Sequence, residues 1–340
     1  MKKSALIWLL VIVVTAALAF VFFSSSSELA EPVPTATVTE TVIETSPEPE
    51  IIKPASCIEL SGGELLDWPC GTPFEDPGFT AYDCNREECS ELVVSEGEVV
   101  CWKVGEYELH YSFTDKNGDS IQAARTVSVN PVSLPAFEAT EQVIYLTFDD
   151  GPCAYTEQVL ELLDEYNAKA TFFVVADEGK YIHFLEEIIA RGHSLGIHCN
   201  SHSYEKIYSS VESYIEDFLE AQKVMYEYTG TYATLSRFPG GSRTAKSYLG
   251  VKGRDEICSI LDDMGIRYFD WNVQPEDSRY GSAEITFELF KQMVPKYPVP
   301  ISLQHDTRNY SVAALEDMLK WGIENGYEFR GLELSTPPAK

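Results

Sequence analysis

Hydrophobic and polar positions divide the chain into stretches of different character, and the first of these is apolar. An uncharged run extends from Ala5 to Phe23 and follows Lys2 and Lys3. At a helical rise of about 1.5 Å per residue, the run nearly spans a bilayer core of about 30 Å. We predict an uncleaved membrane anchor at residues 1–23, with the lysines in the cytoplasm. A cleaved signal peptide is the alternative, because Ala17-Leu18-Ala19 resembles a cleavage site. Both interpretations predict export.

The next two stretches differ in how their apolar residues are arranged. Residues 24–56 are rich in Ser, Pro, Thr and Glu, a composition that cannot bury a core, so we expect a flexible linker. Residues 57–132 contain short apolar runs separated by turn signals such as Gly62-Gly63 and Asn117-Gly118. Apolar and polar positions alternate in residues 107–113, as in a strand with one buried face. The stretch is therefore predicted to be a β-sandwich.

After a predicted linker at residues 133–141, the pattern changes to alternating strands and helices over residues 142–340. The candidate strands are 143–148, 170–175, 194–198, 234–238, 266–271, 300–304 and 327–332. Candidate helices lie between most of them, for example 155–167, 211–228 and 311–325. Repeated βα units predict a parallel sheet, open or closed into a barrel, with catalytic residues at the carboxyl ends of its strands.

Charge and cysteine content narrow the range of partners. The formal net charge of −29 argues against a nucleic-acid partner, because phosphate binding needs clustered Lys and Arg. No protein partner is evident from the sequence. Five of the eight cysteines lie between Cys57 and Cys101, and an exported chain permits disulfides. Cys84 and Cys89 could close a tight loop, whereas the other pairings stay open.

Five polar motifs each follow a candidate strand of the C-terminal region. They are Thr147-Phe148-Asp149-Asp150-Gly151-Pro152, His198-Cys199-Asn200-Ser201-His202, Arg237-Phe238-Pro239-Gly240-Gly241-Ser242, the segment from Phe269 to Ser278, and Leu303-Gln304-His305-Asp306. Taken singly, each has a plain structural interpretation, such as an acidic turn or a pair of partly buried histidines. A barrel would bring all five strand ends to one mouth, and this convergence favours a catalytic site.

The residue types in these motifs suit hydrolysis. Two adjacent carboxylates at a strand end point in different directions, so one of Asp149 and Asp150 could bind a metal while the other acts as a base. His198 and His202 could complete a set of two imidazoles and one carboxylate that leaves positions open for water and substrate. Arg237 could pair with a carboxylate and fix its orientation.

The last two motifs contain a candidate general acid, and the third contains candidate oxyanion donors. His305 is a candidate general acid because imidazole titrates near neutral pH, and Asp277 could raise its pKa through a hydrogen bond. Gly240 and Gly241 could present backbone N–H groups to an oxyanion.

The five motifs, in this order, resemble those of the polysaccharide deacetylases, carbohydrate esterase family four, over roughly residues 142–334. The family implies a distorted (β/α) barrel that removes acetyl groups from N-acetylglucosamine polymers or, in some members, from O-acetylated xylan. Residues 57–132 resemble bacterial surface immunoglobulin-like domains. That second resemblance is carried by Gly71-Thr72-Pro73-Phe74-Glu75-Asp76-Pro77-Gly78, Val104-Gly105-Glu106-Tyr107, residues 111–118 and residues 125–129.

The family resemblance also implies a metal site and a base. Asp150, His198 and His202 would bind a divalent metal, with zinc expected and cobalt or another divalent ion as the alternative. Asp149 would act as the base on the water that the metal binds, and Arg237 would position Asp149.

The same resemblance implies the acid and the substrate contacts. His305 would protonate the leaving amine, and Asp277 would tune His305. Gly240 would donate its N–H to the oxyanion, Leu303 would line the pocket for the acetyl methyl group, and Trp271 would contact substrate.

Three positions depart from the family pattern without removing a ligand, the base or the acid. Cys199 stands where many members carry Thr or Ser, Gly240 where many carry an aromatic residue, and Ser278 where many carry Trp. Cys153 and Cys199 both border the site, as a disulfide, as adventitious metal ligands or as two unpaired, partly buried thiols. The remaining histidines and the last cysteine are interpreted as structural or surface residues: His110, His183, His193 and Cys258.

The leading prediction is an extracytoplasmic hydrolase, anchored to the membrane or secreted if residues 1–23 are cleaved. It would remove N-acetyl groups from a cell-wall glycan, with peptidoglycan amino sugars as the expected substrate. One alternative is an esterase that removes O-acetyl groups from a polysaccharide such as xylan. Another is a catalytically silent carbohydrate-binding protein of the cell surface. A purely structural surface protein would leave the five motifs unexplained.

Overall fold

The computed structural model describes residues 55–177, 179–279 and 281–339. The predicted membrane anchor at residues 1–23 lies outside the described residues, as does all but the end of the predicted linker at 24–56. Within the described ranges, no helix is both long and apolar enough to cross a membrane. The domain boundaries predicted from the sequence stay predictions.

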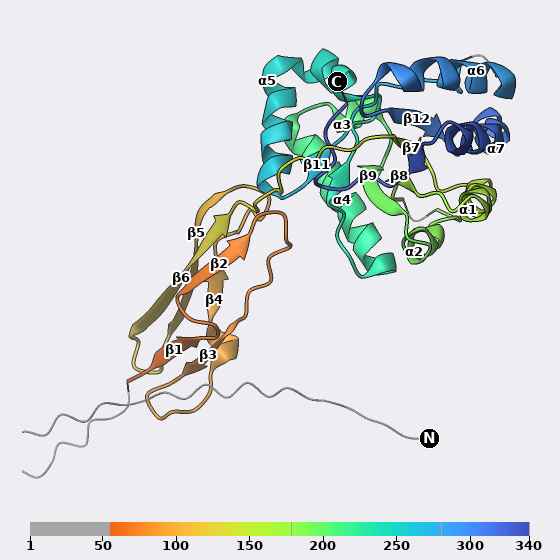
Figure 1. The fold of residues 1–340 in the computed structure, drawn as a ribbon. Helices are drawn as coiled ribbons and strands as arrows, with labels where there is room; N and C mark the ends of the chain where they lie inside the picture. The colour runs from red at the N-terminus through yellow and green to blue at the C-terminus, as the bar shows by residue number, and fades with distance from the viewer. Residues whose placement is uncertain (1–54, 178, 280, 340) are drawn as a thin grey trace, which may run out of the picture. The chain divides into compact units, whose positions relative to one another are not determined.

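The N-terminal part of the described chain consists of β-strands (Figure 1). β1 pairs with β3 in an antiparallel two-stranded sheet, and a four-stranded sheet has the order β2-β6-β5-β4. The predicted strand at residues 107–113 is confirmed as the middle of β5. The strands are β1 (Cys57–Leu60), β2 (Leu65–Pro69), β3 (Phe79–Tyr82), β4 (Val94–Glu96), β5 (Gly105–Thr114) and β6 (Ser120–Asn130), with the short 3-10 helix η1 (Ser90–Leu92) between β3 and β4.

The cysteine loop suggested by Cys84 and Cys89 does not form, and both thiols are free. The Cys89 side chain is buried in a small core with Ala81 and Phe113, where it packs as an apolar residue. Cys84 lies at a partly exposed turn instead.

The C-terminal part is an α/β fold around one parallel sheet, with its helices on the outside (Figure 1). The sheet has the order β11-β10-β9-β8-β7-β12, and β13 pairs with the start of β7. A parallel bridge between Val273, just after β11, and Ser302 in β12 links the two edges, as in a closed but irregular barrel. The strands are β7 (Val143–Asp149), β8 (Ala170–Val175), β9 (Ser194–Cys199), β10 (Leu235–Ser236), β11 (Arg267–Tyr268), β12 (Ile301–His305) and β13 (Glu328–Phe329).

All seven predicted strands and the three named helices of this part are confirmed, although β10, β11 and β13 are shorter than predicted. Two of these short strands end where a polar motif begins: β10 stops before Arg237, and β11 stops before the segment that starts at Phe269. The helices are α1 (Thr156–Glu165), α2 (Phe184–Ala190), α3 (Tyr204–Ile207), α4 (Val211–Thr229), α5 (Ser242–Asp263), α6 (Ala283–Met293) and α7 (Asn309–Glu324), with the 3-10 helix η2 (Val294–Lys296) after α6.

The central strand explains how the sequence places the motifs. Every residue of β7 is buried, as expected for a parallel strand covered on both faces. Its last residue, Asp149, is in register with His305, the last residue of β12. Because the strands run parallel, the segments that follow them all leave the sheet at one end. The prediction that the five motifs converge is therefore met by the topology.

Candidate active site

Three predicted metal ligands lie together at the carboxyl ends of β7 and β9. One donor atom from each of Asp150, His198 and His202 lies within 4.8 Å of the others. Asp150 Oδ1 is 3.4 Å from His198 Nε2 and 3.1 Å from His202 Nε2. Asp150 and His202 both have positive φ values, 69° and 48°, a strained conformation for residues other than glycine that is typical of functional sites.

Neighbouring groups orient these ligands. His198 Nδ1 lies 2.9 Å from the carbonyl oxygen of Arg237, which can only accept a hydrogen bond. His198 Nδ1 therefore carries the hydrogen, and the lone pair of its Nε2 faces Asp150. The loop between the two histidines is held by Asp217 of α4, which accepts hydrogen bonds from the backbone N–H groups of Asn200 at 2.7 Å and Ser201 at 3.1 Å.

The electrostatics of the cluster favour an ionised Asp150 and a neutral His198, whereas the hydrogen bond to Asp150 raises the pKa of His202. Burial would raise the pKa of Asp150, but the hydrogen bond from His202 and the positive charge that the nearby histidines can carry lower it to about 2. Burial is the largest influence on His198 and lowers its pKa. One carboxylate oxygen and two imidazole nitrogens form a donor set that suits zinc and related divalent metals. The residues present therefore fit the metal that the sequence predicts.

The second carboxylate, Asp149, is paired with Arg237 rather than with the histidines. Arg237 Nη1 donates to Asp149 Oδ1 at 2.8 Å, and both side chains are buried, at 0% and 3% relative exposure. In the described part of the chain, Asp149 Oδ2 accepts no hydrogen bond, so one oxygen stays available. The predicted contact between Arg237 and Asp149 is present.

Arg237 is fixed on several sides. Its Nε donates to the carbonyl oxygen of Phe269 at 2.9 Å, and its Nη1 also donates to Thr147 Oγ1 at 2.5 Å. Its guanidinium carbon lies 4.3 Å from the ring centre of Phe173 and 5.6 Å from that of Trp271. Such cation–π contacts, together with the hydrogen bonds, hold the guanidinium in a single place.

His305 and Asp277 form the second predicted pair. Asp277 is buried and accepts hydrogen bonds from His305 Nδ1 at 3.0 Å and from the His305 backbone N–H at 2.8 Å. Burial lowers the pKa of His305, but the hydrogen bond and charge of Asp277 and the nearby Asp149 and Asp150 outweigh it, so the pKa is raised. His305 Nε2 lies 4.0 Å from Asp150 Oδ2 and thus faces the metal cluster.

The predicted substrate residues border the same region. Leu303 lies in β12 two positions before His305, so both side chains leave the same face of the strand. Gly240 has a φ of 71°, and a Cβ there would lie 2.8 Å from both Thr244 Oγ1 and the Tyr204 hydroxyl. No side chain larger than that of glycine fits without a shift of these neighbours. Trp271 donates its indole N–H to Gln274 Oε1 at 3.0 Å.

Several supporting residues escaped the sequence analysis. Thr147 and Phe173 contact Arg237, and Asp217 holds the loop between the two histidines. The Tyr204 ring packs edge-on against His202, with 5.7 Å between the ring centres. Thr147 belongs to a named motif, but nothing in the sequence linked Asp217 or Phe173 to the site.

The alternative of a disulfide between Cys153 and Cys199 does not form. The Cys153 thiol donates to the carbonyl oxygen of Asp306 at 3.3 Å, and Cys199 is buried at the end of β9. His193, predicted to be structural, is buried, and its Nδ1 accepts from the Ala170 backbone N–H at 3.3 Å.

Comparison with known proteins agrees with this geometry. A family model described as polysaccharide deacetylase matches residues 137–267, and one described as the Ig-like domain of bacterial surface proteins matches residues 58–129. The chain is 32% identical over 213 residues to a peptidoglycan-N-acetylglucosamine deacetylase of Bacillus cereus, a match that covers 60% of this chain and 74% of that protein.

The chain belongs to the polysaccharide deacetylase family. The predicted enzyme class, a hydrolase that cleaves amide bonds, is confirmed with it. The fold agrees with the catalytic domain of a peptidoglycan N-acetylglucosamine deacetylase from Eubacterium rectale, at a TM-score of 0.57 and 35% identity, over 61% of this chain and 95% of that one. The predicted α/β class with an N-terminal immunoglobulin-like domain is likewise confirmed.

Relatives within the family differ in the sugar that their names record. A peptidoglycan-N-acetylmuramic acid deacetylase of Bacillus subtilis is 30% identical to the chain over 204 residues, which cover 58% of this chain and 40% of that protein. Family membership therefore leaves open which amino sugar this deacetylase acts on.

Proposed function

We propose that this deacetylase removes N-acetyl groups from the amino sugars of peptidoglycan with the help of a divalent metal, for which zinc is the expected ion. One observation carries the proposal: the cluster of Asp150, His198 and His202 lies beside a carboxylate fixed by arginine and an imidazole fixed by a carboxylate. These are the components that amide hydrolysis needs, because an amide is a poor electrophile with a poor leaving group.

Asp150, His198 and His202 would hold the metal. When bound, such an ion polarises the acetamide carbonyl group and makes water more acidic. Asp150 supplies a carboxylate with a pKa of about 2, ionised at every physiological pH, and the Nδ1 hydrogen bond of His198 directs its Nε2 toward Asp150.

Asp149 is proposed as the general base. Arg237 binds Asp149 Oδ1 and orients the carboxylate, while Oδ2 can take a proton from the attacking water. The water oxygen then bonds to the acetamide carbon, and the N–H of Gly240 is proposed to donate to the resulting oxyanion.

His305 is proposed as the general acid. Because Asp277 engages Nδ1, the free Nε2 can give its proton to the sugar nitrogen as the carbon–nitrogen bond breaks. The products are acetate and a sugar with a free amine. The raised pKa of His305 favours the protonated form that this step uses.

The proposed location is outside the cytoplasmic membrane. The Ig-like family match at residues 58–129 supports a surface protein, and the apolar run at residues 5–23 is proposed as the anchor. Residues 24–56 would then separate the enzyme from the membrane and let it reach the wall.

Acetate release tests this proposal. The full-length chain would be treated with a chelator, then supplied with zinc or cobalt, and offered N-acetylglucosamine oligomers, intact peptidoglycan and acetylated xylan in parallel. We expect chelation to abolish release and zinc or cobalt to restore it on the N-acetylated glycans.

Two results would contradict the proposal. Release from xylan alone would indicate the esterase. No release from any of the three, by folded protein with one metal ion bound per chain, would indicate the silent carbohydrate-binding protein.

A further inference from the structure

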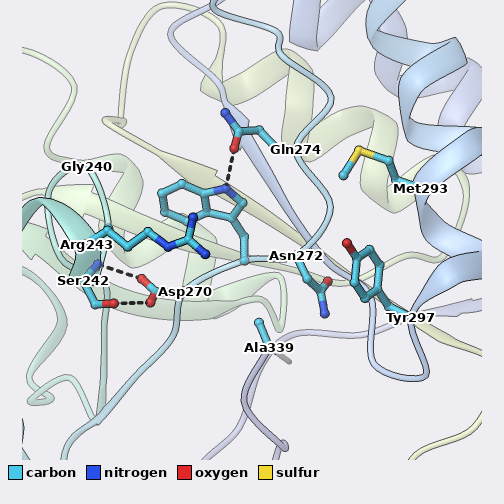
Figure 2. Close-up of a pocket in the computed structure, with 11 residues that line it drawn as sticks. Gly240, Ser242, Arg243, Asp270, Asn272, Gln274, Met293, Tyr297 and Ala339 are labelled. Atoms are coloured by element: carbon cyan, nitrogen blue, oxygen red, sulfur yellow. Dashed lines mark hydrogen bonds between the residues drawn. The ribbon is translucent and has the colours of Figure 1, made fainter.

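A cavity of about 530 Å³ borders the candidate active site and shares Gly240 and Trp271 with it, and most of its other lining residues have no role in the mechanism above. Figure 2 shows the residues that line it. Its lining comes from the start of α5, the segment after β11, and the region around η2. Trp271 joins the cavity to the catalytic centre, because it lines the cavity and its ring lies 5.6 Å from the guanidinium carbon of Arg237. Any sugar bound in this cavity would therefore be a neighbour of the reacting sugar.

Two aromatic side chains line the cavity. The indole of Trp271 is held by its hydrogen bond to Gln274, and a Cβ at Gly241 would lie 2.9 Å from that ring. The glycine therefore lets the indole pack directly against the loop. Tyr297 supplies a second aromatic side chain to the lining (Figure 2). Aromatic surfaces with a few polar groups between them are typical of ligand sites.

The charges in the cavity are arranged asymmetrically. Both oxygens of the Asp270 carboxylate accept hydrogen bonds from Ser242: Oδ1 from its backbone N–H at 2.9 Å, and Oδ2 from its hydroxyl. The other charged lining residue is Arg243, which is exposed and whose extended side chain Figure 2 shows among the lining residues. Across the described ranges, no carboxylate lies within 4.0 Å of its guanidinium group.

An arginine with no carboxylate of the described chain within 4.0 Å is notable in a protein whose formal net charge is −29. Such a chain repels anionic polymers at long range, so any anionic group that it binds needs a local positive charge. Guanidinium offers two parallel N–H donors, which match the two oxygens of a carboxylate.

We infer that this cavity binds a sugar that carries a carboxylate, next to the sugar that loses its acetyl group, and that Arg243 binds the carboxylate. The inference rests on the proposed function and narrows its substrate to glycans with an acidic substituent near the scissile acetamide. In peptidoglycan this group has two sources: the lactyl carboxylate of muramic acid, or a carboxylate of the peptide attached to it. Polymers of N-acetylglucosamine alone carry neither.

Kinetics on matched glycan strands test the inference. The zinc-loaded full-length chain would be given N-acetylglucosamine oligomers and three strands of equal length that contain muramic acid: one with free lactyl carboxylates, one with those carboxylates methyl-esterified, and one with peptides attached. The variants are Arg243→Gln and, as a matched control, Arg330→Gln, whose arginine is exposed and paired with Glu328.

We expect Arg243→Gln to lower kcat/KM about tenfold on carboxylate-bearing strands, mainly through KM, and to leave the neutral and esterified strands unchanged. Tenfold is near the lower end of what a charge-assisted hydrogen bond contributes, as suits an exposed arginine. Arg330→Gln should behave as the parent chain on every strand. A loss confined to the peptide-bearing strand would assign the carboxylate to the peptide, and a loss on free lactyl strands would assign it to the sugar.

Two outcomes would overturn the inference while the proposed function stands. One is that neither the free lactyl strand nor the peptide-bearing strand reacts faster than the esterified and neutral strands. The other is an Arg243→Gln loss of equal size on neutral oligomers. Calorimetric binding of the same strands to the Asp149→Asn variant, with and without Arg243→Gln, gives a readout that needs no turnover. If no strand releases acetate, the proposed function fails. The inference is then decided by whether the carboxylate still strengthens binding through Arg243.

Discussion

The buried pair of Arg237 and Asp149 allows a quantitative test of how the base is held. Arg237→Met removes the only side-chain cation within 4.0 Å of Asp149 in the described chain and leaves a carboxylate that is 3% exposed without compensation. Breaking a buried ion pair from one side costs about 3–5 kcal/mol. Thr147 and the carbonyl oxygen of Phe269 also lose a donor, so we expect the upper part of this range.

Asp149→Asn and the double variant complete the cycle. With the carboxylate neutral, loss of the arginine should cost less, so the double variant should be more stable than the sum of the single changes by about 1–3 kcal/mol. Urea unfolding of the metal-free chain would be followed by helical circular dichroism. All seven α-helices of the described chain lie between Thr156 and Glu324, so this signal reports the deacetylase part. Strict additivity, or a loss below about 1 kcal/mol for Arg237→Met, would refute the idea that this pair holds a buried charge.

Three further changes separate the roles of individual residues. Asp149→Asn should abolish turnover and leave bound zinc, measured by mass spectrometry, largely intact, whereas His202→Ala should lose the zinc itself. Asp277→Asn should move the alkaline limb of the kcat/KM profile to lower pH: the carboxylate raises the pKa of His305, the acid must be protonated, and activity is lost as pH rises through that pKa. Gly240→Ala should lower stability in thermal unfolding by about 1–3 kcal/mol, because φ is positive and the Cβ meets two side chains.

Matched variants control for unrelated effects. Asp255→Asn and His110→Ala change exposed residues and should alter neither activity nor metal content. Gly230 has a φ of 67°, close to the 71° of Gly240, but open space surrounds the position of its Cβ. Gly230→Ala therefore measures the cost of backbone strain without the side-chain contacts present at Gly240. Equal zinc loss in Asp149→Asn and His202→Ala, an unmoved alkaline limb in Asp277→Asn, or equal destabilisation of the two glycine variants would each contradict the corresponding assignment.

The sequence predicted the fold of the deacetylase part well because its signals are local. The apolar run of β7 followed by Asp149 and Asp150 marks a buried strand and its end, and parallel topology then brings His305 beside Asp149. The same logic placed His198 and His202 together. Motif order thus carried three-dimensional information that no single motif contains.

What the sequence missed depends on packing between distant elements. Asp217 lies in the middle of α4 and binds the loop between the two histidines, yet an acidic residue on an amphipathic helix normally faces solvent. Phe173 reads as an ordinary core residue, although Arg237 lies over its ring. Of the two alternatives for Cys153 and Cys199, the structure has the free thiols, because nearness to one site does not make two thiols point at each other.

The hydrogen bonds from the Asn200 and Ser201 backbone to Asp217 have a consequence for the folding of this protein. Small zinc modules fold only when the ion gathers ligands that are otherwise scattered. Here Asp217 of α4 orders the ligand loop through two hydrogen bonds from backbone N–H groups, and β7 brings Asp150 to it. The chain should therefore fold completely without any ion. The metal would then bind to a preformed site. An enzyme that folds where metal is scarce would gain activity later, once it binds ions at its place of action.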